Sequence, residues 1–540
     1  MYFCGGVMYK WILRIFLLSI FIPVIARANI WNPNISDKKY RNPVIFADYS
    51  DPDVIRVGDD FFMTSSSFNC VPGLPILHSK DLVNWTLVNY ALPELSEFFD
   101  TPGHGDGVWA PSLRYHKGSY YIFYGDPDFG IYQVKTKDPF GKWDKPILVK
   151  SAHGNIDPCP FWDDDGKVYM VHAFAHSRAG VKSLLQINQL SKDATSILDK
   201  GTIVYDGHED NPTIEGPKLY KRNGYYYIFA PAGGVKEGWQ TVLRSKSIMG
   251  PYEAKIVMAQ GNTTINGPHQ GAWVELDSGE SWFLHFQDKG PWGRIVHLQP
   301  MTWRNDWPII GMDSDGDGIG EPVLVYQKPD VLYLCSESRK MLKENFAKPF
   351  LSLDWQWHAN IQPNWFSLNA NPGSLRLYAM PVNPGYQNLW QAPNLLLQKF
   401  QGPEFTASCE MDFQNLKDGE RSGLVIMGQE YALLCVRKQN QKWMIEQIIC
   451  HNAKDGTPET MVETKQLAIQ TGPVHLKVDV NTEAVCQFLF KQKNQNFISI
   501  GSAFQAVPGR WIGAKVGVFC QQLKKNTEQG FVDYHFFEIQ

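Results

Sequence analysis

The sequence predicts an all-β protein made of a five-bladed β-propeller followed by a β-sandwich of the jelly-roll or concanavalin-A-like kind. A unit of turn and aromatic strand recurs five times between residues 51 and 284, which is typical of propeller blades. After roughly residue 335 the repeat stops, and alternating strands with few helical patterns indicate a second all-β domain. The composition of the 540 residues, 44% hydrophobic and 13% aromatic, is that of a globular protein with a large core.

The clearest copy of the repeat begins at Glu215. A predicted strand over 213–220 is followed by an Asn223-Gly224 turn and an aromatic strand over 225–229, and an Asn-Gly turn between two strands is a strong hairpin signal. In every copy the end of a turn lies nine residues after the head of the unit. The heads are spaced 48 to 58 residues apart, a period that fits one four-stranded blade with its loops. The five heads are Asp51, Trp109, Asp157, Glu215 and Gln270.

Equivalent heads are expected to form a ring around the propeller axis. Each blade begins with its innermost strand, so residues near the start of that strand face one central opening. Three acids and a tryptophan at one opening indicate protonation chemistry on a ligand with a flat apolar face. The alternative is that each acid serves only its local turn, as Asp often does. Gln270 is assigned no chemistry.

The charge balance of the chain and its N-terminal residues indicate which binding partners and which cellular location to expect. With 51 basic and 55 acidic residues the chain carries no electrostatic footprint for nucleic acid or anionic membrane. Lys10 and Arg14 precede an apolar run, and Ala26-Arg27-Ala28 provides a cleavage site, so residues 1–28 are predicted to be a signal peptide. The mature protein would then be periplasmic or extracellular and free of the membrane. An uncleaved anchor is the alternative, although the run is short for a membrane span.

The domain boundaries follow from the change in pattern. We predict the propeller over 29–338, a polar linker over 339–350 and the sandwich over 351–540. The nine cysteines show no metal-ligand spacing, so buried thiols or one or two disulfides are expected. The expected strands of the sandwich are 404–413, 422–436, 443–450, 474–490, 515–520 and 531–539.

Several phrases around the heads resemble those of a known enzyme family. Taken together with the trailing sandwich, they make the chain similar to glycoside hydrolase family 43, of the β-xylosidase and α-L-arabinofuranosidase type. The resemblance covers nearly the whole chain after the predicted signal peptide. The phrases are Asp51-Pro52-Asp53, Gly107-Val108-Trp109-Ala110-Pro111, Ile156-Asp157-Pro158, Ile214-Glu215-Gly216-Pro217 and Gly293-Arg294.

The resemblance implies a role for each acid. Asp51 matches the general base, Glu215 the general acid, and Asp157 the third acid that orients Glu215 and raises its pKa. A neighbouring carboxylate disfavours ionisation, which agrees with a Glu215 that stays protonated. Members of the family invert configuration, so the carboxyl groups of Asp51 and Glu215 are expected roughly 6.5 to 9.5 Å apart, with room for water between them.

Four further residues are candidates for substrate binding. Arg294 matches an arginine that contacts sugar hydroxyls, while Trp109 and Phe68 are expected to wall the pocket for the terminal sugar. His269 matches a channel histidine that in relatives sometimes lies near a calcium ion or water. Its other interpretation is a histidine whose ring is satisfied by backbone groups.

A separate acidic loop has features of a calcium site. Asp313, Asp315 and Asp317 occupy positions one, three and five of a loop, as in calcium loops. Position twelve is Leu324 rather than Glu, so a solvated acidic turn is the alternative. Any calcium here would be structural, because the loop lies after the chemistry of the last blade. The chemistry itself is expected to require no cofactor.

The sequence therefore predicts an exo-acting, inverting glycosidase that releases terminal xylose or arabinofuranose from oligosaccharides of xylan or arabinan. One alternative is a retaining fructan-type glycosidase, although the Asn-Asp-Pro-Asn and Arg-Asp-Pro phrases of that group are absent. The other is a non-catalytic, carbohydrate-binding propeller. The sequence leaves the choice between the two sugars and the oligomeric state open.

Overall fold

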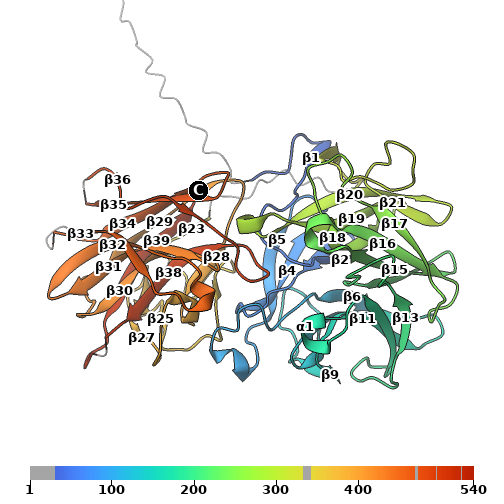
Figure 1. Ribbon diagram of the computed structural model, residues 1–540, viewed down its shortest axis with the longest axis horizontal. Helices are drawn as coiled ribbons and strands as arrows, with labels where there is room; N and C mark the ends of the chain where they lie inside the picture. Colours follow the sequence, from blue (N-terminus) through green and yellow to red (C-terminus); the bar gives the residue numbers. More distant parts are fainter. Residues whose placement is uncertain (1–30, 332–341, 469–471, 494, 525) are drawn as a thin grey trace, which may run out of the picture.

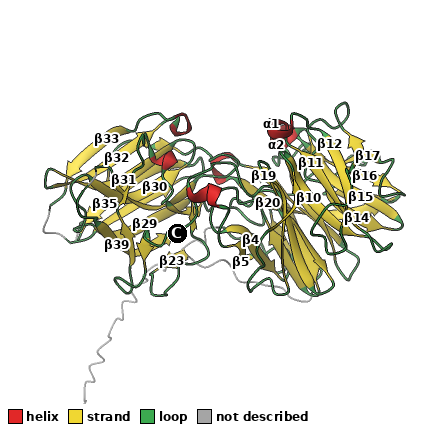
Figure 2. Ribbon diagram, turned by 90° about the horizontal axis from the view of Figure 1, so that it is seen from below, coloured by secondary structure: helices red, strands yellow, loops and turns green. Residues whose placement is uncertain are grey.

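The computed structural model describes residues 31–331, 342–468, 472–493, 495–524 and 526–540. It shows two domains side by side, built almost entirely of strands (Figures 1 and 2). The predicted signal peptide lies outside the described residues. None of the helices in the described part of the chain has the length and apolar character needed to cross a membrane.

The first domain is a propeller of five four-stranded antiparallel blades, each built from consecutive strands. Blade 1 comprises β2 (Asp53–Val57), β3 (Asp60–Thr64), β4 (Gly73–Ser79) and β5 (Thr86–Leu92). Blade 2 comprises β6 (Ser112–His116), β7 (Ser119–Asp126), β8 (Gly130–Thr136) and β9 (Ile147–Ser151). Blade 3 comprises β10 (Asn155–Trp162), β11 (Val168–Phe174), β12 (Leu184–Leu190) and β13 (Thr202–Asp206). Blade 4 comprises β14 (Lys218–Arg222), β15 (Tyr225–Ala232), β16 (Trp239–Ser245) and β17 (Glu253–Met258). Blade 5 comprises β18 (His269–Glu275), β19 (Ser281–Asp288), β20 (Arg294–Arg304) and β21 (Trp307–Ile310).

The local sequence explains both the hairpins and the packing of the blades. In blade 4, Asn223 and Gly224 join β14 to β15 with φ of 50° and 73°, the left-handed conformation that a tight hairpin turn requires. Aromatic side chains fill the space between blades; for example, the rings of Phe62 in blade 1 and Tyr120 in blade 2 meet edge to face at 5.3 Å. The first strands of blades 1 to 4 contact one another in turn, and β18 of blade 5 contacts β2 of blade 1 and β15 of blade 4, so the first strands surround the axis as predicted.

The segment before blade 1 closes the ring. Because every blade uses its own four consecutive strands, the two ends of the propeller share no blade. Instead, Ile45 exchanges backbone hydrogen bonds of 3.2 and 3.0 Å with Val296 of β20. The Asn42 amide donates to the carbonyl oxygen of Leu298 on the same strand at 2.8 Å. Nearby, β1 (Lys39–Arg41) pairs with β22 (Val325–Gln327).

The second domain is a sandwich of two large sheets. The nine-stranded sheet comprises β25 (Phe366–Ser367), β26 (Leu375–Tyr378), β39 (Phe531–Ile539), β29 (Phe405–Asp412), β34 (Val474–Val480), β35 (Val485–Gln492), β36 (Ile498–Ser499), β23 (Leu342–Glu344) and β37 (Phe504–Gln505). The eight-stranded sheet comprises β24 (Gln356–Trp357), β28 (Leu396–Lys399), β38 (Lys515–Gln522), β30 (Glu420–Met427), β31 (Tyr431–Gln439), β32 (Lys442–Cys450), β33 (Thr460–Gln466) and β27 (Met380–Pro381). Burial alternates along β29 and β34, because one face of the sheet lies in the core and the other in solvent.

The structure corrects three boundaries in this domain. The strand predicted over 422–436 is a hairpin of β30 and β31, which turns at residues 428–430. The strand predicted over 474–490 is also a hairpin, because the Asn481 side chain accepts backbone hydrogen bonds from Glu483 and Val485 and turns the chain there. The predicted linker contains β23, which pairs with β39, so the sandwich already includes residues 342–344.

Both domains contain short helices and buried cysteines. The helices within the described residues are α1 (His176–Ala179), α2 (Gly234–Glu237), η1 (Glu97–Asp100), η2 (Gly290–Trp292), η3 (Leu389–Gln391) and η4 (Ala453–Asp455). The seven cysteines in the described part of the chain are all buried and unpaired, as expected of thiols that serve packing.

Backbone contacts dock the sandwich on the propeller. Val71 and Trp357 exchange hydrogen bonds of 3.0 and 2.7 Å across the boundary, and the Ala514 N–H donates to the carbonyl oxygen of Pro291 at 2.7 Å. Gly513 lies against Gly293, where an added Cβ would come within 2.8 Å of the backbone nitrogen. The loop over 507–513 is thereby fixed next to Arg294 at the start of β20.

Candidate active site

One pocket of about 120 Å³ brings the five blade heads together at the centre of the propeller. It is lined by Asp51, Trp109, Asp157, Glu215, Gln270, Phe68, Ala110, Ile156, Val235, His269, Arg294 and Trp511. All seven residues predicted from the sequence to act on or bind substrate are among them. The predicted ring therefore exists, and its three acids face the same small space.

Left-handed backbone conformations turn several of these side chains. Asp51, Asp157 and Gln270 have φ of 55°, 57° and 33°. Asp157 and Gln270 also lie where the pairing of β10 and of β18 shifts register, as at a β-bulge. Non-glycine residues rarely adopt positive φ, and Asp tolerates it better than most. Such strain is concentrated at functional sites because the surrounding fold must hold it.

Asp51 is held by two partners. The Ser66 hydroxyl donates to Oδ2 at 2.5 Å, and Nη1 of Arg294 donates to Oδ1 at 3.0 Å in a buried ion pair. Each carboxylate oxygen is therefore fixed, and the carboxylate can accept a proton from a water molecule without first reorienting. Ser66 was not predicted, because a serine within the run Ser65-Ser66-Ser67 carries no distinguishing pattern.

Asp157 and Glu215 are linked through the backbone of Gly216. The Gly216 N–H donates to Oδ2 of Asp157 at 2.7 Å, and Nε2 of Gln270 approaches the same oxygen at 3.5 Å. Gly216 has φ of 60°, and an added Cβ would lie 2.7 Å from the Gln270 side chain, so glycine is needed here. Asp157 thus fixes the backbone next to Glu215, as its predicted orienting role requires.

Burial and the neighbouring carboxylates raise the pKa of Glu215. Desolvation contributes most, followed by the charges of Asp157 and Asp51, while Arg294 opposes the shift. The pKa of Asp157 is also raised, mainly by burial and then by Asp51. The Glu215 side chain is 34% exposed and has no fixed hydrogen-bond partner within the described residues, so its proton faces the pocket.

His269 lies beside the general-acid candidate as a neutral ring. Its Nε2 is 3.5 Å from Oε1 of Glu215, but burial, reinforced by Arg294, lowers the pKa of His269 to about 3. The contact is therefore not an ion pair. In the described part of the chain both ring nitrogens lack a hydrogen-bond partner, so the interpretation of a backbone-satisfied histidine is wrong. A buried ring with two unmet nitrogens is suited to bind a sugar hydroxyl or an ordered water.

Aromatic rings form the walls of the pocket. Phe68 and Trp109 meet edge to face at 6.4 Å, and Trp109 meets Trp511 at 6.5 Å. Trp511 belongs to the sandwich and is 48% exposed, with φ of 64°. Trp511 was not predicted as a pocket residue, because it lies in a loop of the other domain some four hundred residues from Trp109.

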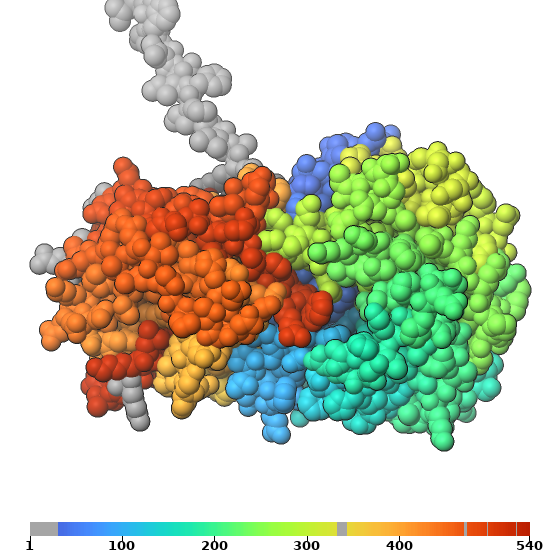
Figure 3. Space-filling model, viewed as in Figure 1, coloured from blue at the N-terminus to red at the C-terminus, as the bar shows by residue number. Residues whose placement is uncertain are grey.

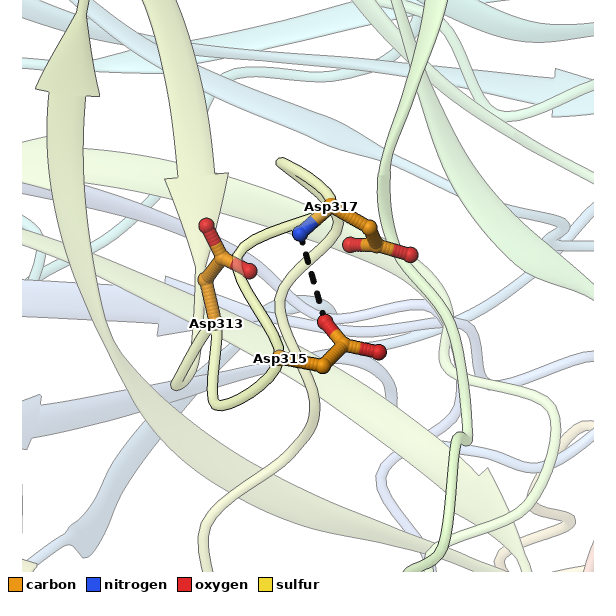
Figure 4. A group of neighbouring side chains, drawn as sticks. All are labelled: Asp313, Asp315 and Asp317. Atoms are coloured by element: carbon orange, nitrogen blue, oxygen red, sulfur yellow. Dashed lines mark hydrogen bonds between the residues drawn. The ribbon is translucent and has the colours of Figure 1, made fainter.

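The acidic loop lies away from this pocket, after β21. Carboxylate oxygens of Asp313, Asp315 and Asp317 all lie within 4.8 Å of one another (Figure 4). Asp313 also pairs with Arg304 at 3.1 Å. Glu321, at position nine of the same loop, accepts a hydrogen bond from the backbone N–H of Asn262 at 3.2 Å and is thus engaged away from the three aspartates. The three oxygens suit a hard cation such as Ca²⁺, and calcium at this loop stays a prediction.

Comparisons with known proteins identify the family. Residues 40–308 match the model of glycosyl hydrolases family 43, and residues 343–540 match that of the beta xylosidase C-terminal concanavalin A-like domain. A β-xylosidase of Formosa agariphila is 33% identical over 562 residues, covering 95% of this chain and 92% of that protein. A non-reducing end α-L-arabinofuranosidase of Bacteroides ovatus is 30% identical over 515 residues, covering 91% and 92%.

A solved structure supports the same assignment over both domains. The xylan β-1,4-xylosidase from Bacillus halodurans superposes with a TM-score of 0.81 at 26% identity, covering 93% of this chain and 99% of that one. The fructan-type enzyme and the non-catalytic propeller are left without support. The chain belongs to glycoside hydrolase family 43 and is a glycosidase that hydrolyses O-glycosyl bonds.

Proposed function

We propose that the protein is an exo-acting, inverting glycosidase that removes terminal xylose or arabinofuranose from plant oligosaccharides. The observation that carries the proposal is the contrast between two carboxyl groups in one pocket. Asp51 is anchored by Ser66 and Arg294, whereas Glu215 is raised in pKa and has no fixed partner in the described structure. An ionised base opposite a protonated acid is the arrangement that hydrolysis by single displacement needs.

In the proposed reaction Asp51 accepts a proton from a water molecule as the water oxygen attacks the anomeric carbon. The bond from that carbon to the glycosidic oxygen breaks, and Glu215 donates its proton to the departing oxygen. Asp157 acts through Gly216 to hold Glu215 in place and to keep it protonated. Both functions are performed by side chains of this chain, so the proposed chemistry requires no cofactor.

Exo action is supported by the size of the pocket and by its walls. About 120 Å³ accommodates a single terminal sugar rather than the middle of a chain. Trp511 of the sandwich closes one side together with Phe68 and Trp109. The relatives named above include both a β-xylosidase and an α-L-arabinofuranosidase, so both pentoses remain in the proposal.

We further propose export by residues 1–28, on the basis of the basic residues, the apolar run and the Ala26-Arg27-Ala28 site. Plant oligosaccharides would then be met in the periplasm or outside the cell.

Proton NMR during hydrolysis tests the central proposal. The protein starting at Asn29 is incubated in parallel with nitrophenyl β-D-xylopyranoside and nitrophenyl α-L-arabinofuranoside, and the first anomer released is identified. Inverted pentose is expected from at least one of them, and the relative rates rank the two sugars. Retained product would make Asp51 a nucleophile and overturn the mechanism. Absence of turnover on both would overturn the proposed sugars.

A further inference from the structure

A second, larger cavity adjoins the catalytic pocket. It has a volume of about 980 Å³ and lies between the domains, which Figure 3 shows meeting along a hollowed seam. Arg294 and Trp511 line both this groove and the catalytic pocket, so the two spaces adjoin at these residues. The propeller contributes residues 101–104 and the sandwich residues 508–512.

The position of the groove makes it the place for the leaving group, and this step depends on the proposed function. In the proposed reaction the small pocket holds the terminal sugar, so we expect the rest of the oligosaccharide to extend past Arg294 and Trp511 into the adjoining groove. The contacts that choose between leaving groups are therefore expected in the groove and not around the three catalytic acids.

Arg510 is the unusual residue of this groove. Within the described structure its exposed guanidinium makes no hydrogen bond and no ion pair, while its stem packs on Gly105 so closely that an added Cβ there would lie 2.6 Å from Cγ. The nearby carboxylate of Asp106 pairs with Arg178 at 2.6 Å and interacts with Arg510 only through its charge. The side chain of Arg510 is thus positioned by packing, while its five N–H donors face solvent with no acceptor from the described part of the chain.

The other charges of the groove leave Arg510 available. Lys454 is a second exposed cation with no partner in the described part of the chain. Of the acids, Asp288 accepts from the backbone of Gly290 at 3.0 Å, and Asp455 lies next to Lys454 along the chain. No acid that lines the groove forms an ion pair with Arg510 within the described residues.

Aromatic faces accompany these cations. Trp390 of the sandwich stacks on His104 of the propeller with ring centroids 3.6 Å apart, and both line the groove. Trp511 presents a half-exposed ring at the entrance to the catalytic pocket. Flat apolar faces next to unmet N–H donors are suited to a sugar ring that carries an anionic group.

We propose that the groove binds a leaving group carrying a uronic acid, and that the guanidinium of Arg510 pairs with its carboxylate. A planar guanidinium matches a carboxylate with two parallel hydrogen bonds, which a neutral sugar hydroxyl does not reproduce. The natural substrates would then include oligosaccharides with a neutral pentose at the non-reducing end and an acidic sugar behind it.

Binding to a variant whose turnover of oligosaccharides is strongly reduced tests this directly. Glu215→Gln protein is titrated calorimetrically with neutral xylotriose and with a xylotriose that carries a glucuronic acid branch on its reducing-end unit. The acidic oligosaccharide is expected to bind about five- to tenfold more tightly, with the advantage shrinking as salt screens the pair. Adding Arg510→Gln is expected to abolish the difference, while Arg510→Lys retains part of it because the charge remains.

Lys137→Gln provides the matched control, since it removes an exposed cation of blade 2 that does not line the groove. It is expected to leave the acidic preference unchanged. Equal binding of the two oligosaccharides, or a preference that survives Arg510→Gln, would overturn the proposal. Failure of the proposed function is seen separately, in the anomer released from nitrophenyl pentosides, because their leaving group carries no uronic acid.

Discussion

Replacing Glu215 with Gln should separate substrates by their leaving groups. The amide keeps the size of the side chain but has no acidic proton to donate. Within the pocket no other carboxyl replaces it, because Asp51 is anchored by Ser66 and Arg294, and Asp157 accepts from Gly216. General acid catalysis contributes about 10²- to 10⁴-fold, or roughly 3 to 5 kcal/mol of barrier.

We therefore expect kcat on a xylo- or arabino-oligosaccharide to fall by about 10²- to 10⁴-fold, whereas kcat on a nitrophenyl glycoside falls by less than about tenfold. Nitrophenolate leaves without protonation, so the acid is dispensable there. Steady-state kinetics of both substrates measure this, and Asp51→Asn is the control, expected to lose activity on both. An equal loss on both substrates for Glu215→Gln would refute the assignment of Glu215 as the acid.

Four further predictions concern the same residues and the acidic loop. Asp157→Asn removes a charge that raises the pKa of Glu215, so the alkaline limb of the profile of kcat against pH should move to lower pH by about one unit. An alkaline limb at the same pH would contradict the electrostatic role of Asp157. Glu215→Gln should raise Tm by about 2–4 °C at pH 7 but not at pH 4. Above about pH 4.5 the carboxyl group of Glu215 ionises in the unfolded chain but keeps its proton in the native protein, which favours unfolding, and glutamine removes this effect. The same rise in Tm at both pH values would exclude this linkage. Gly216→Ala should lower kcat/KM at least about tenfold with an unchanged circular dichroism spectrum, since the new Cβ collides with Gln270, and wild-type kinetics would show that the site relaxes. Millimolar calcium should raise the Tm of the chelator-treated protein by a few degrees, Asp315→Asn should remove that gain, and no gain in the wild type would favour the solvated turn.

The ring of blade heads was predictable because equivalent positions of a sequence repeat occupy equivalent places in the fold. A period near 55 residues with a turn nine residues after each head fixes equivalent positions, and equivalent positions in a propeller share one opening. The structure confirms the five blades and brings Asp51, Asp157 and Glu215 into one pocket. The roles of these acids remain predictions, which the experiments above test.

Contacts between the domains could not be predicted in this way. Trp511 reaches the pocket, and Arg510 reaches the groove, only because the sandwich docks through Val71, Trp357 and Ala514. No periodic pattern connects these residues, since Arg510, Trp511 and Ala514 lie in a loop whose path depends on tertiary packing. The same reason applies to Ser66, a loop serine whose role appears only when Asp51 is placed beside it.

The backbone of the pocket suggests why the acids lie where they do. Asp51, Asp157 and Gln270 all have positive φ, and Gly216 beside Glu215 has it as well. A residue in this conformation directs its side chain away from the regular alternation of a strand, toward the axis shared by all blades. Strain of roughly 1–3 kcal/mol at each non-glycine position must be offset by the packing of the propeller. Precise placement of the carboxyl groups is thus a property of the whole ring. The N-terminal segment contributes to it, because Ile45 closes the ring by pairing with the strand that begins at Arg294.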